Sequence, residues 1–363
     1  MRGAINPGFW AGKRVFLTGH TGFKGSWASI LLADMGAHVK GYALTPPTSP
    51  ALFEEARVAE MIESQVGDIR DPETLRAAMM AFNPDLVIHM AAQPLVRLSF
   101  REPVETYSTN VMGTVHVLEA ARACPNLRAV LNVTSDKCYE NREWEWGYRE
   151  HEPMGGFDPY SNSKGCSELV TSAYRRSFFA DPDGPQLASG RAGNVIGGGD
   201  WADDRLIPDS LRAFHDGTPV VIRNPQATRP WQHVLEPICG YLVLVQALYD
   251  HGATYADGWN FGPRDEDARP VSWILDRLVN HWGAGASWTL DTGAQPHEAR
   301  FLKLDVSKAA THLGWHPTWG LEDVLGRIVH WHRAYLEGED IRAACLAEIK
   351  DYLDAMSKGR AAA

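Results

Sequence analysis

The sequence lacks long apolar runs, paired cysteines and an excess of positive charge. No segment reaches the roughly 18 consecutive apolar residues that a membrane-spanning helix needs, and the opening "MRGAINPGFWAGK" lacks the apolar core of a signal peptide. The formal charge is −10, from 35 basic and 45 acidic residues, which argues against nucleic acid or an anionic membrane as the main partner. We therefore expect a cytoplasmic protein that binds neither.

Cysteine and histidine are too dispersed to build a disulfide framework or a metal site. The five cysteines form no CxxC pair, and an odd number without framework spacing predicts reduced thiols; they are Cys124, Cys138, Cys166, Cys239 and Cys345. No His/Cys cluster has the spacing of a zinc site, so no metal is expected. The 363 residues are 44% hydrophobic, enough to bury a sizeable core in one large or two modest domains.

The first half of the chain alternates between strand-like and helix-like segments. Apolar runs such as "RVFLTG", "DLVIHMAA" and "AVLNVTS" are separated by helical stretches such as "GSWASILLADMG" and "DPETLRAAMMAF". This alternation predicts an α/β fold with a doubly wound parallel sheet of the Rossmann type. We assign residues 1–196 to a dinucleotide-binding domain. Residues 197–363, with Gly/Pro/Trp-rich loops, are expected to form a smaller substrate-binding region interleaved with the first.

A glycine-rich turn follows the first predicted strand. In "LTGHTGFKG", Gly19, Gly22 and Gly25 surround Thr21 and Phe23 and lead into a helix. Glycines let a backbone approach a pyrophosphate closely, and a helix N-terminus offers free N–H groups. The alternative is a tight turn with no ligand.

Two further strand ends carry candidate cofactor contacts. Asp68 and Ile69 in "VGDIRD" are placed to bracket an adenine ring, although Asp68 could instead cap the helix that begins at Pro72. Ala91 and Ala92, followed by Gln93, end the strand of "HMAAQPLV", where small residues would let a nicotinamide ribose approach the backbone.

Tyr160 and Lys164 in "PYSNSKG" are candidate catalytic residues. Four residues apart on a helix, they share a face. A nearby ammonium favours the phenolate, and a phenolate can take the proton of a substrate hydroxyl as hydride leaves its carbon. Ser135, at the end of "LNVTS", is placed to hydrogen-bond the same substrate oxygen.

The glycine turn, the Ser135/Tyr160/Lys164 set and Asn110 in "STNVMGT" resemble the extended short-chain dehydrogenase/reductase family. Within it, "TSDKCYENREWEWGYRE", "AGNVIGGGDWADDRLIPD" and "RNPQATRPWQHVLEP" are similar to nucleotide-sugar 4,6-dehydratases that act on CDP-glucose. The resemblance runs from about Trp10 to Leu336. It implies NAD as cofactor, CDP-glucose as substrate, and a product, CDP-4-keto-6-deoxyglucose, that feeds deoxysugar and surface polysaccharide synthesis. It also implies a homodimer or higher oligomer formed through helices beginning near Pro103 and Tyr160.

The resemblance assigns roles to the pair that follows Ser135. It makes Asp136 the acid that protonates the departing C6 hydroxyl, and Lys137 the base that removes the C5 proton. A base must be neutral, so this role needs a depressed Lys137 pKa. If Lys137 stays charged, it would instead stabilise the C5 enolate. The plain alternative is an exposed Asp-Lys pair at a strand end.

The sequence leaves the cofactor's ribose contact open and offers several nucleotide contacts. After the second strand, "GYALTPP" provides neither an acidic residue for ribose hydroxyls nor an Arg for a 2′-phosphate. Arg205 precedes Leu206, Ile207 and Pro208, an apolar stretch suited to a flat base. The candidate phosphate ligands are Asn194, Arg229 and Arg300.

Three other functions remain open at this stage. Within the same fold, the chain could be a dehydratase for another nucleotide sugar or a 4-epimerase. A non-catalytic dinucleotide sensor is the alternative outside enzymes, although such sensors tend to lose the reactive Tyr or Lys.

Overall fold

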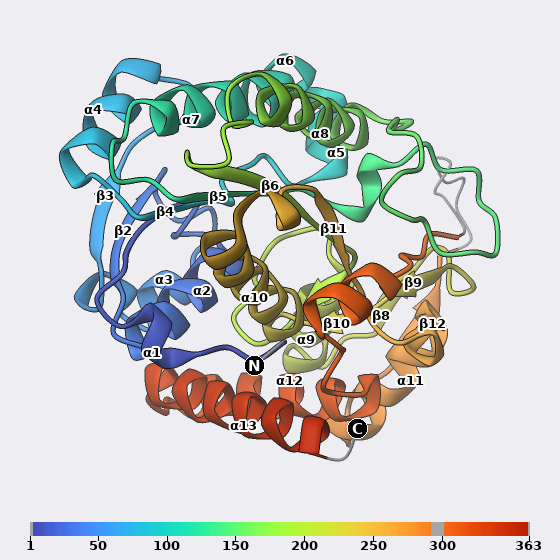
Figure 1. The fold of residues 1–363 in the computed structure, drawn as a ribbon. Coiled ribbons are helices and arrows are strands. Elements are labelled where there is room, and N and C mark those ends of the chain that lie inside the picture. Colours follow the sequence, from blue (N-terminus) through green and yellow to red (C-terminus); the bar gives the residue numbers. More distant parts are fainter. Residues whose placement is uncertain (1–2, 292–300, 362–363) are drawn as a thin grey trace.

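The computed structural model describes residues 3–291 and 301–361, with side chains up to residue 358. Its centre is a sheet of seven parallel strands in the order β3-β2-β1-β4-β5-β6-β11 (Figure 1). The strands are β1 (Arg14–Thr18), β2 (His38–Ala43), β3 (Glu63–Val66), β4 (Leu86–His89), β5 (Ala129–Val133), β6 (Gln186–Ala192) and β11 (Gly258–Phe261).

The central strands are buried along their whole length because helices cover both faces of the sheet. Every residue of β4, β5 and β6 is buried. One face carries α4 (Pro72–Phe82), α7 (Gly113–Arg122) and α8 (Pro159–Ser177); the other carries α2 (Phe23–Asp34) and α10 (Leu235–His251). The predicted doubly wound α/β fold is confirmed.

The helices begin where the sequence places capping residues. Asp71 accepts hydrogen bonds from the backbone N–H groups of Glu73 and Thr74 at the start of α4, with Pro72 at the first helical position. Asp158 does the same for α8 through the N–H of Ser161. Asp71 is therefore the cap of α4, and the alternative role of Asp68 as that cap is wrong.

The helix predicted from Pro103 onward is not continuous. It consists of α6 (Pro103–Tyr107), a π-helical turn at Ser108–Met112, and α7. A π-turn holds one extra residue and is frequent at functional positions. Here it contains Asn110, whose side chain turns inward and is buried.

The chain from residue 195 onward builds small elements and then returns to the sheet. The small elements are β7 (Val195–Ile196), α9 (Leu206–His215), β8 (Val220–Ile222), β9 (Thr228–Pro230), β10 (Gln232–His233), β12 (Ala268–Pro270), α11 (Val271–Trp282) and β13 (Trp288–Leu290). β7 pairs with β10, β9 with β12, and β8 with β13. The boundary at 196/197 stays a prediction, but both α10 and β11 come from the second segment and complete the first.

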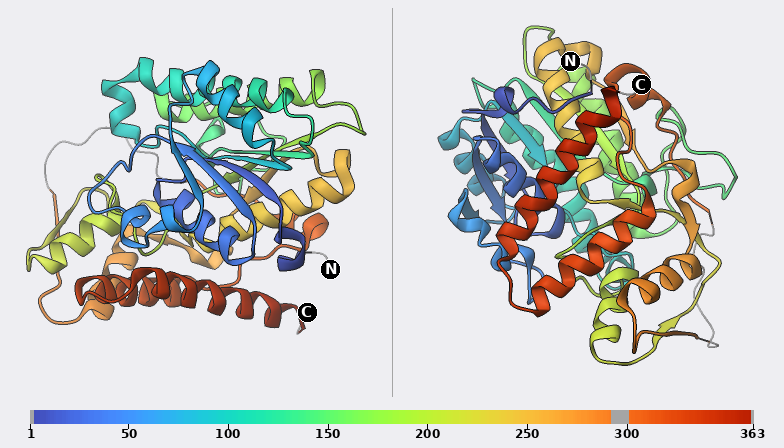
Figure 2. Two further views of the ribbon diagram at one scale, coloured as in Figure 1. Left: turned by 90° about the vertical axis from the view of Figure 1, so that its left-hand side faces the viewer. Right: turned by 90° about the horizontal axis from the view of Figure 1, so that it is seen from below.

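The C-terminal helices add an outer layer. α12 (Leu321–Leu336) leads into α13 (Ile341–Ala361), which packs against α2 along the outside of the molecule (Figure 2). The remaining short helices are α1 (Pro7–Trp10), α3 (Leu52–Glu55) and α5 (Val96–Arg101). In the described part of the chain, no helix has the length and apolar character to cross a membrane.

Candidate active site

The glycine turn is shaped to receive a phosphate group. Gly19 has φ +81°, and a Cβ there would lie 2.7 Å from the Ala91 nitrogen. A Cβ on Gly25 would overlap the Gly19 carbonyl oxygen, so this glycine lets α2 start tightly against the turn. Gly22, the N-cap of α2, makes no side-chain cap, which leaves the first N–H groups of the helix for a ligand. The turn therefore fits a pyrophosphate.

Thr21 and Phe23 support the turn from both sides. The Thr21 hydroxyl donates to the Leu44 carbonyl at 2.8 Å, which ties the turn to the end of β2. Phe23 is half-buried beside Gly197, at the first residues of the second segment. Because β1 and β4 are neighbours and the chain winds away from them in opposite directions, the turn lies at the switch point of the sheet, where ligands bind in such folds.

The predicted adenine contacts are held in place by their own neighbours. The Asp68 carboxylate accepts bonds from the Arg70 backbone N–H at 2.8 Å and from Arg70 Nε at 2.9 and 3.0 Å. These bonds lower the pKa of Asp68, so its carboxylate is ionised. Ile69 is buried against Gly113 on α7. Their contact with adenine stays a prediction.

Asn110 fixes the turn after β4 to α8. Its Oδ1 accepts from the Gln93 N–H at 2.8 Å, and its Nδ2 donates to the Gln93 carbonyl at 3.0 Å and to Ser163 Oγ at 2.9 Å. Asn110 and Gln93 are both buried. On the same strand end, the Ala91 N–H is bonded to Thr18 Oγ1 at 3.1 Å, while Ala92 is half-buried. The side chains of Asn110 and Gln93 therefore form hydrogen bonds with other residues of the protein.

The structure brings Ser135, Asp136 and Tyr160 together. Ser135 follows β5, and its hydroxyl donates to Asp136 Oδ1 at 3.0 Å while accepting from the Lys137 N–H at 3.2 Å. Ser135 also forms a hydrogen bond with the Tyr160 hydroxyl. Tyr160 opens α8, and Lys164 lies one turn further along the same helix. All of these side chains are buried except Lys137, which is half-buried.

Burial dominates the protonation of the Tyr160/Lys164 pair in the ligand-free protein. It raises the pKa of Tyr160 to about 12, against a smaller lowering by the bond from Ser135. It lowers the pKa of Lys164 to about 7, assisted by the positive charge of Lys24. Both shifts favour the neutral forms. A phenolate at Tyr160 would therefore require neighbouring groups that keep Lys164 charged.

Asp136 has the environment of a carboxyl group that keeps its proton. Burial raises its pKa against the opposing charges of Lys137 and Arg229. Its Oδ2 is buried and has no hydrogen-bond partner within the described residues, and it faces Gly193 and Pro230. A buried polar atom without a partner suits a group that meets a ligand.

The predicted nucleotide contacts are spread around this centre. Arg205 is the N-cap residue of α9, and its charge acts on both Lys24 and Tyr160. The charge of Arg229 reaches Asp136, and its Nη1 donates to the Thr228 carbonyl at 3.0 Å. Asn194, half-buried between β6 and β7, accepts from the Gln232 N–H through its carbonyl.

The apolar residues that follow Arg205 are mostly packed in the interior of the protein. Ile207 packs in the main hydrophobic core, Pro208 is buried on the same helix, and Leu206 is half-buried. Their contact with a base stays a prediction. Arg300 lies outside the described residues.

Lys24 and Glu168 are two charged residues beside this site that the sequence reasoning missed. Lys24, inside the glycine turn, is subject to the charges of Arg205, Asp136 and Asp200, and burial lowers its pKa to about 8. Its position in the first turn of the helix that follows the glycines could have identified it from the sequence. Glu168 is buried one turn after Lys164, at the same four-residue spacing that identified Lys164.

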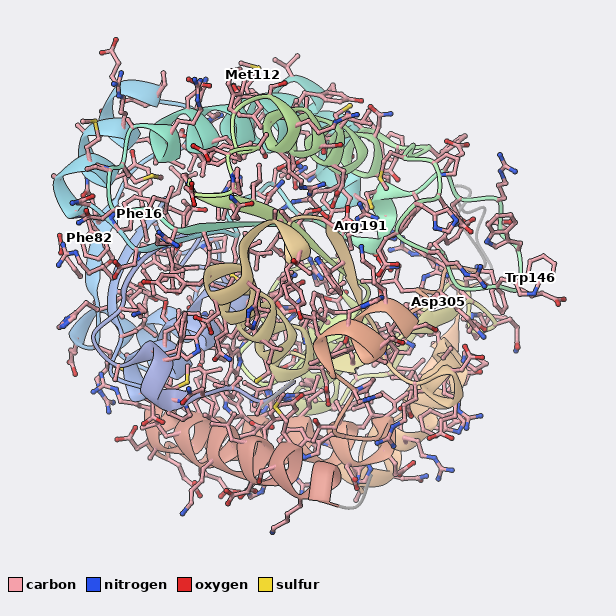
Figure 3. The ribbon with its side chains drawn as sticks, in the orientation of Figure 1. Phe16, Phe82, Met112, Trp146, Arg191 and Asp305 are labelled. Atoms are coloured by element: carbon pink, nitrogen blue, oxygen red, sulfur yellow. The ribbon has the colours of Figure 1, made fainter. Side chains whose placement is uncertain are left out.

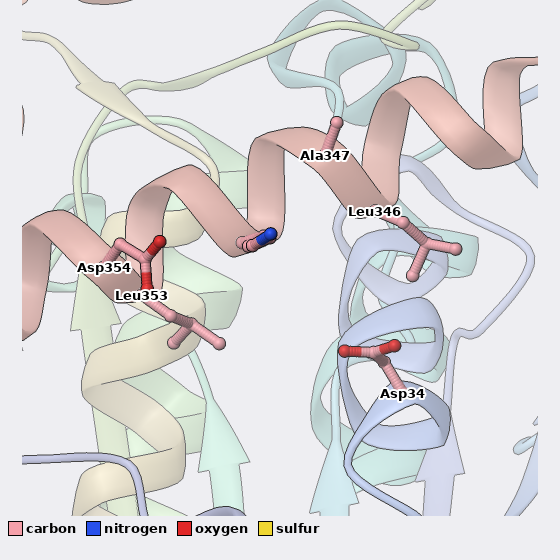
Figure 4. A pocket seen from close by; sticks show the side chains of 6 residues that line it. Asp34, Leu346, Ala347, Leu353 and Asp354 are labelled. Atoms are coloured by element: carbon pink, nitrogen blue, oxygen red, sulfur yellow. The ribbon is translucent and has the colours of Figure 1, made fainter.

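A pocket of about 420 Å³ lies away from this centre, between the end of α2 and α13 (Figure 4). It is lined by Asp34, Leu346, Ala347, Lys350, Leu353 and Asp354. No catalytic candidate lines it. Within residues 3–291 and 301–358, no group of three or more His, Cys, Asp or Glu side chains is placed to hold a metal ion.

The fold and the site together define a dinucleotide-binding α/β protein with a Ser/Tyr/Lys set at the carboxyl edge of its sheet. Residues 16–328 match the family described as GDP-mannose 4,6 dehydratase, and the chain belongs to this family. It is 62% identical, over 98% of its length and all of the relative's, to a CDP-glucose 4,6-dehydratase of Salmonella typhimurium. It is 26% identical, over 88% of its length and 92% of the relative's, to a probable dTDP-glucose 4,6-dehydratase of Sinorhizobium fredii.

Solved structures share the fold. An epimerase from Methanothermobacter thermautotrophicus superposes with a TM-score of 0.77 at 21% identity, covering 91% of this chain and 94% of the other. A dTDP-glucose 4,6-dehydratase from Bacillus anthracis, solved in complex with NAD, gives a TM-score of 0.73 at 18% identity, covering 91% and 99%. At these identities the likeness establishes the fold.

Proposed function

We propose that the protein is a nucleotide-sugar 4,6-dehydratase that converts CDP-D-glucose into CDP-4-keto-6-deoxy-D-glucose with loss of water, using NAD. The observation that carries this proposal is the position of Asp136 and Lys137, next to Ser135 and within reach of the Tyr160 end of α8. A 4-epimerase needs no such additional acid–base pair. The relative at 62% identity, named for CDP-glucose, supports the choice of substrate.

The chain's own residues account for the proton movements. Tyr160 takes the proton of the C4 hydroxyl, with Ser135 hydrogen-bonded to the same oxygen. NAD, held at the glycine turn, would supply the hydride acceptor for C4 and the hydride donor for C6, and the proton removed from C5 would be replaced as C6 is reduced. The C4 ketone acidifies the C5 proton, and Lys137 acts there, as a base or as a charge that stabilises the enolate. The protonated carboxyl of Asp136 gives its proton to the leaving C6 hydroxyl, which departs as water.

The cofactor is assigned to the glycine turn. Gly19, Gly22, Gly25 and the free N–H groups of α2 would hold the pyrophosphate. The end of β2 offers no acidic side chain and no arginine to the adenosine ribose, so the choice of NAD over NADP rests on the family and on NAD-bound proteins of the same fold.

Product analysis tests the function directly. Purified protein would be incubated with NAD and, in parallel, CDP-, dTDP-, UDP- or GDP-glucose, and the alkaline chromophore of the 4-keto-6-deoxy sugar measured. We expect kcat/KM to be highest for CDP-glucose. Equal or higher kcat/KM for dTDP-glucose would overturn the substrate but not the reaction. An epimerised sugar without the chromophore would overturn the reaction.

We also propose a homodimer formed through the helices of one sheet face. Large apolar side chains are exposed there on α6, on the π-turn, on α8 and just after α8: Val104, Met112, Leu169 and Phe178. Figure 3 shows Met112 on the outer side of this helix layer. Burying such a face twice over a two-fold axis is the usual way to remove it from water. A monomer in sedimentation at micromolar concentration would refute this. We place the enzyme in the cytoplasm, supplying a deoxysugar for surface polysaccharide.

A further inference from the structure

Glu168 is a buried carboxylate that the proposed reaction does not use. It is 4% exposed and lies on α8 one turn after Lys164. Its Oε1 accepts from Thr134 Oγ1 at 2.5 Å, and its Oε2 accepts from Ser189 Oγ at 2.7 Å and from Arg191 Nη2 at 2.8 Å. The carboxylate therefore joins α8 to the end of β5 and to the neighbouring strand β6.

The Arg191 guanidinium extends this connection to the segment after the catalytic residues. Arg191 is 5% exposed and lies inside the molecule (Figure 3). Its Nη1 donates to the Tyr139 hydroxyl at 2.7 Å and to the Glu150 carbonyl at 2.9 Å. Thr134 immediately precedes Ser135, and Tyr139 follows it by four positions. The Glu168–Arg191 pair thus holds both ends of the segment that carries Ser135, Asp136 and Lys137.

A buried ion pair gives little net stability, because removing two charges from water offsets their attraction. Burial alone would raise the pKa of Glu168. The charge and hydrogen bond of Arg191 and the bonds from Thr134 and Ser189 lower it by more, so the carboxylate is ionised. A permanently charged carboxylate in this position needs a reason other than stability.

The electrostatic environment of Lys164, one turn before Glu168 on α8, explains why a charged carboxylate is needed there. The groups that act on Lys164 are Lys24 from the start of α2, Cys138 from the turn after β5, and Glu168 from its own helix. Tyr160 lies one turn before Lys164 on α8, and His89 on β4 is subject to the charge of Lys164. Burial raises the pKa of Cys138 and of Tyr160, and it lowers the pKa of His89 to about 3, so all three are neutral. Lys24 opposes the charge on Lys164. Glu168 is then the ionised group of this set that favours it.

We infer that Glu168 is a positioning residue of the reaction: its buried carboxylate, one helical turn from Lys164, favours the protonated form of that lysine, and it fixes α8 against the end of β5 so that Tyr160 meets Ser135. The inference rests on the proposed function. A charged Lys164 stabilises the Tyr160 phenolate, and proton abstraction at C4 needs that phenolate. Without Glu168, a buried lysine beside Lys24 loses its proton more readily.

The test separates charge from structure. Glu168→Gln keeps the shape but leaves Arg191 buried and unpaired, which can prevent folding. The double variant Glu168→Gln/Arg191→Gln removes both charges and is therefore the main reagent. Thr134→Val is the matched control, because it removes one bond to Glu168 and leaves the charge. For each variant, the pH dependence of kcat/KM for keto-sugar formation from CDP-glucose would be measured, together with KM for CDP-glucose.

A lysine is charged below its pKa, so lowering that pKa brings the loss of activity at high pH to a lower pH. We expect the double variant to move this alkaline limb down by about one unit and to lower kcat at least roughly 10-fold, with KM little changed. Thr134→Val should lower kcat without moving the limb. A double variant with the alkaline limb of the unmodified enzyme would overturn the inference and leave the proposed function standing. Absence of keto-sugar from the unmodified enzyme would overturn both.

Discussion

Alanine substitutions at two glycines of the turn are expected to have different effects, one on the stability of the fold and the other on the binding of NAD. In Gly25→Ala the new Cβ overlaps the Gly19 carbonyl oxygen and lies 2.7 Å from its carbon and 2.8 Å from the His20 Cα. These are backbone atoms, so the turn and the start of α2 must move apart. In Gly22→Ala the nearest atom is the Gly19 oxygen at 3.5 Å, an ordinary contact, and the residue has φ −80°.

Overpacking against backbone costs about 3 kcal/mol at the upper end of the usual range. With an unfolding entropy of roughly 2.1 cal/mol/K per residue over 363 residues, this lowers the melting temperature by about 4 °C. Gly22→Ala should melt close to the unmodified protein. It adds a methyl group at the N-cap of α2, next to the N–H groups assigned to the pyrophosphate, so we expect it to lose the rise in melting temperature that NAD gives the unmodified protein.

Thermal unfolding with and without NAD measures both effects. Gly25→Ala melting at the unmodified temperature would show that the turn relaxes freely, and the argument from close backbone approach would fail. If NAD raises the melting temperature of Gly22→Ala as much as that of the unmodified protein, the assignment of the pyrophosphate to this turn is refuted.

Three substitutions test the chemistry. Tyr160→Phe should lower the rate of C4 oxidation by roughly 10²–10⁴-fold while substrate binding persists, as followed by reduced-cofactor absorbance after adding CDP-glucose; near-normal turnover would show that Tyr160 is not the base. Lys137→Ala should leave C4 oxidation intact and slow elimination by a similar factor, so reduced cofactor accumulates and C5 exchange with deuterated water is poor; unchanged exchange and turnover would make the Asp136–Lys137 pair a plain strand-end contact. Asp136→Asn should retain C5 exchange and fail to release the C6 hydroxyl, a pattern that loss of the base cannot produce.

The sequence was sufficient where local chemistry decides the outcome. Continuous apolar strands predicted a sheet covered on both faces, and Asp71–Pro72 marked the start of α4 correctly. The spacing of Tyr160 and Lys164 predicted their shared helix. These features depend on neighbouring residues, and a single sequence contains that information.

The features that were missed depend on contacts between distant segments. In the π-turn, the Asn110 side chain bonds Gln93 and Ser163, which come from other elements. The depressed pKa of Lys164 arises mainly from burial, which spacing alone cannot give. Glu168 could not be singled out because its hydrogen-bond partners Thr134 and Arg191 are distant in the sequence and are brought to it only by folding.

The pairing of β11 with β6 has a consequence for how the protein is made. While the ribosome has delivered only residues 1–196, β6 is the outermost strand of the sheet, and its unpaired N–H and C=O groups are open to another chain. That edge is covered after Gly258–Phe261 emerges, and α10 must cover the sheet face in the same interval. Fragments that stop near the predicted domain boundary are therefore expected to aggregate during expression, and a cut placed after β11 should yield more soluble protein than one placed before it.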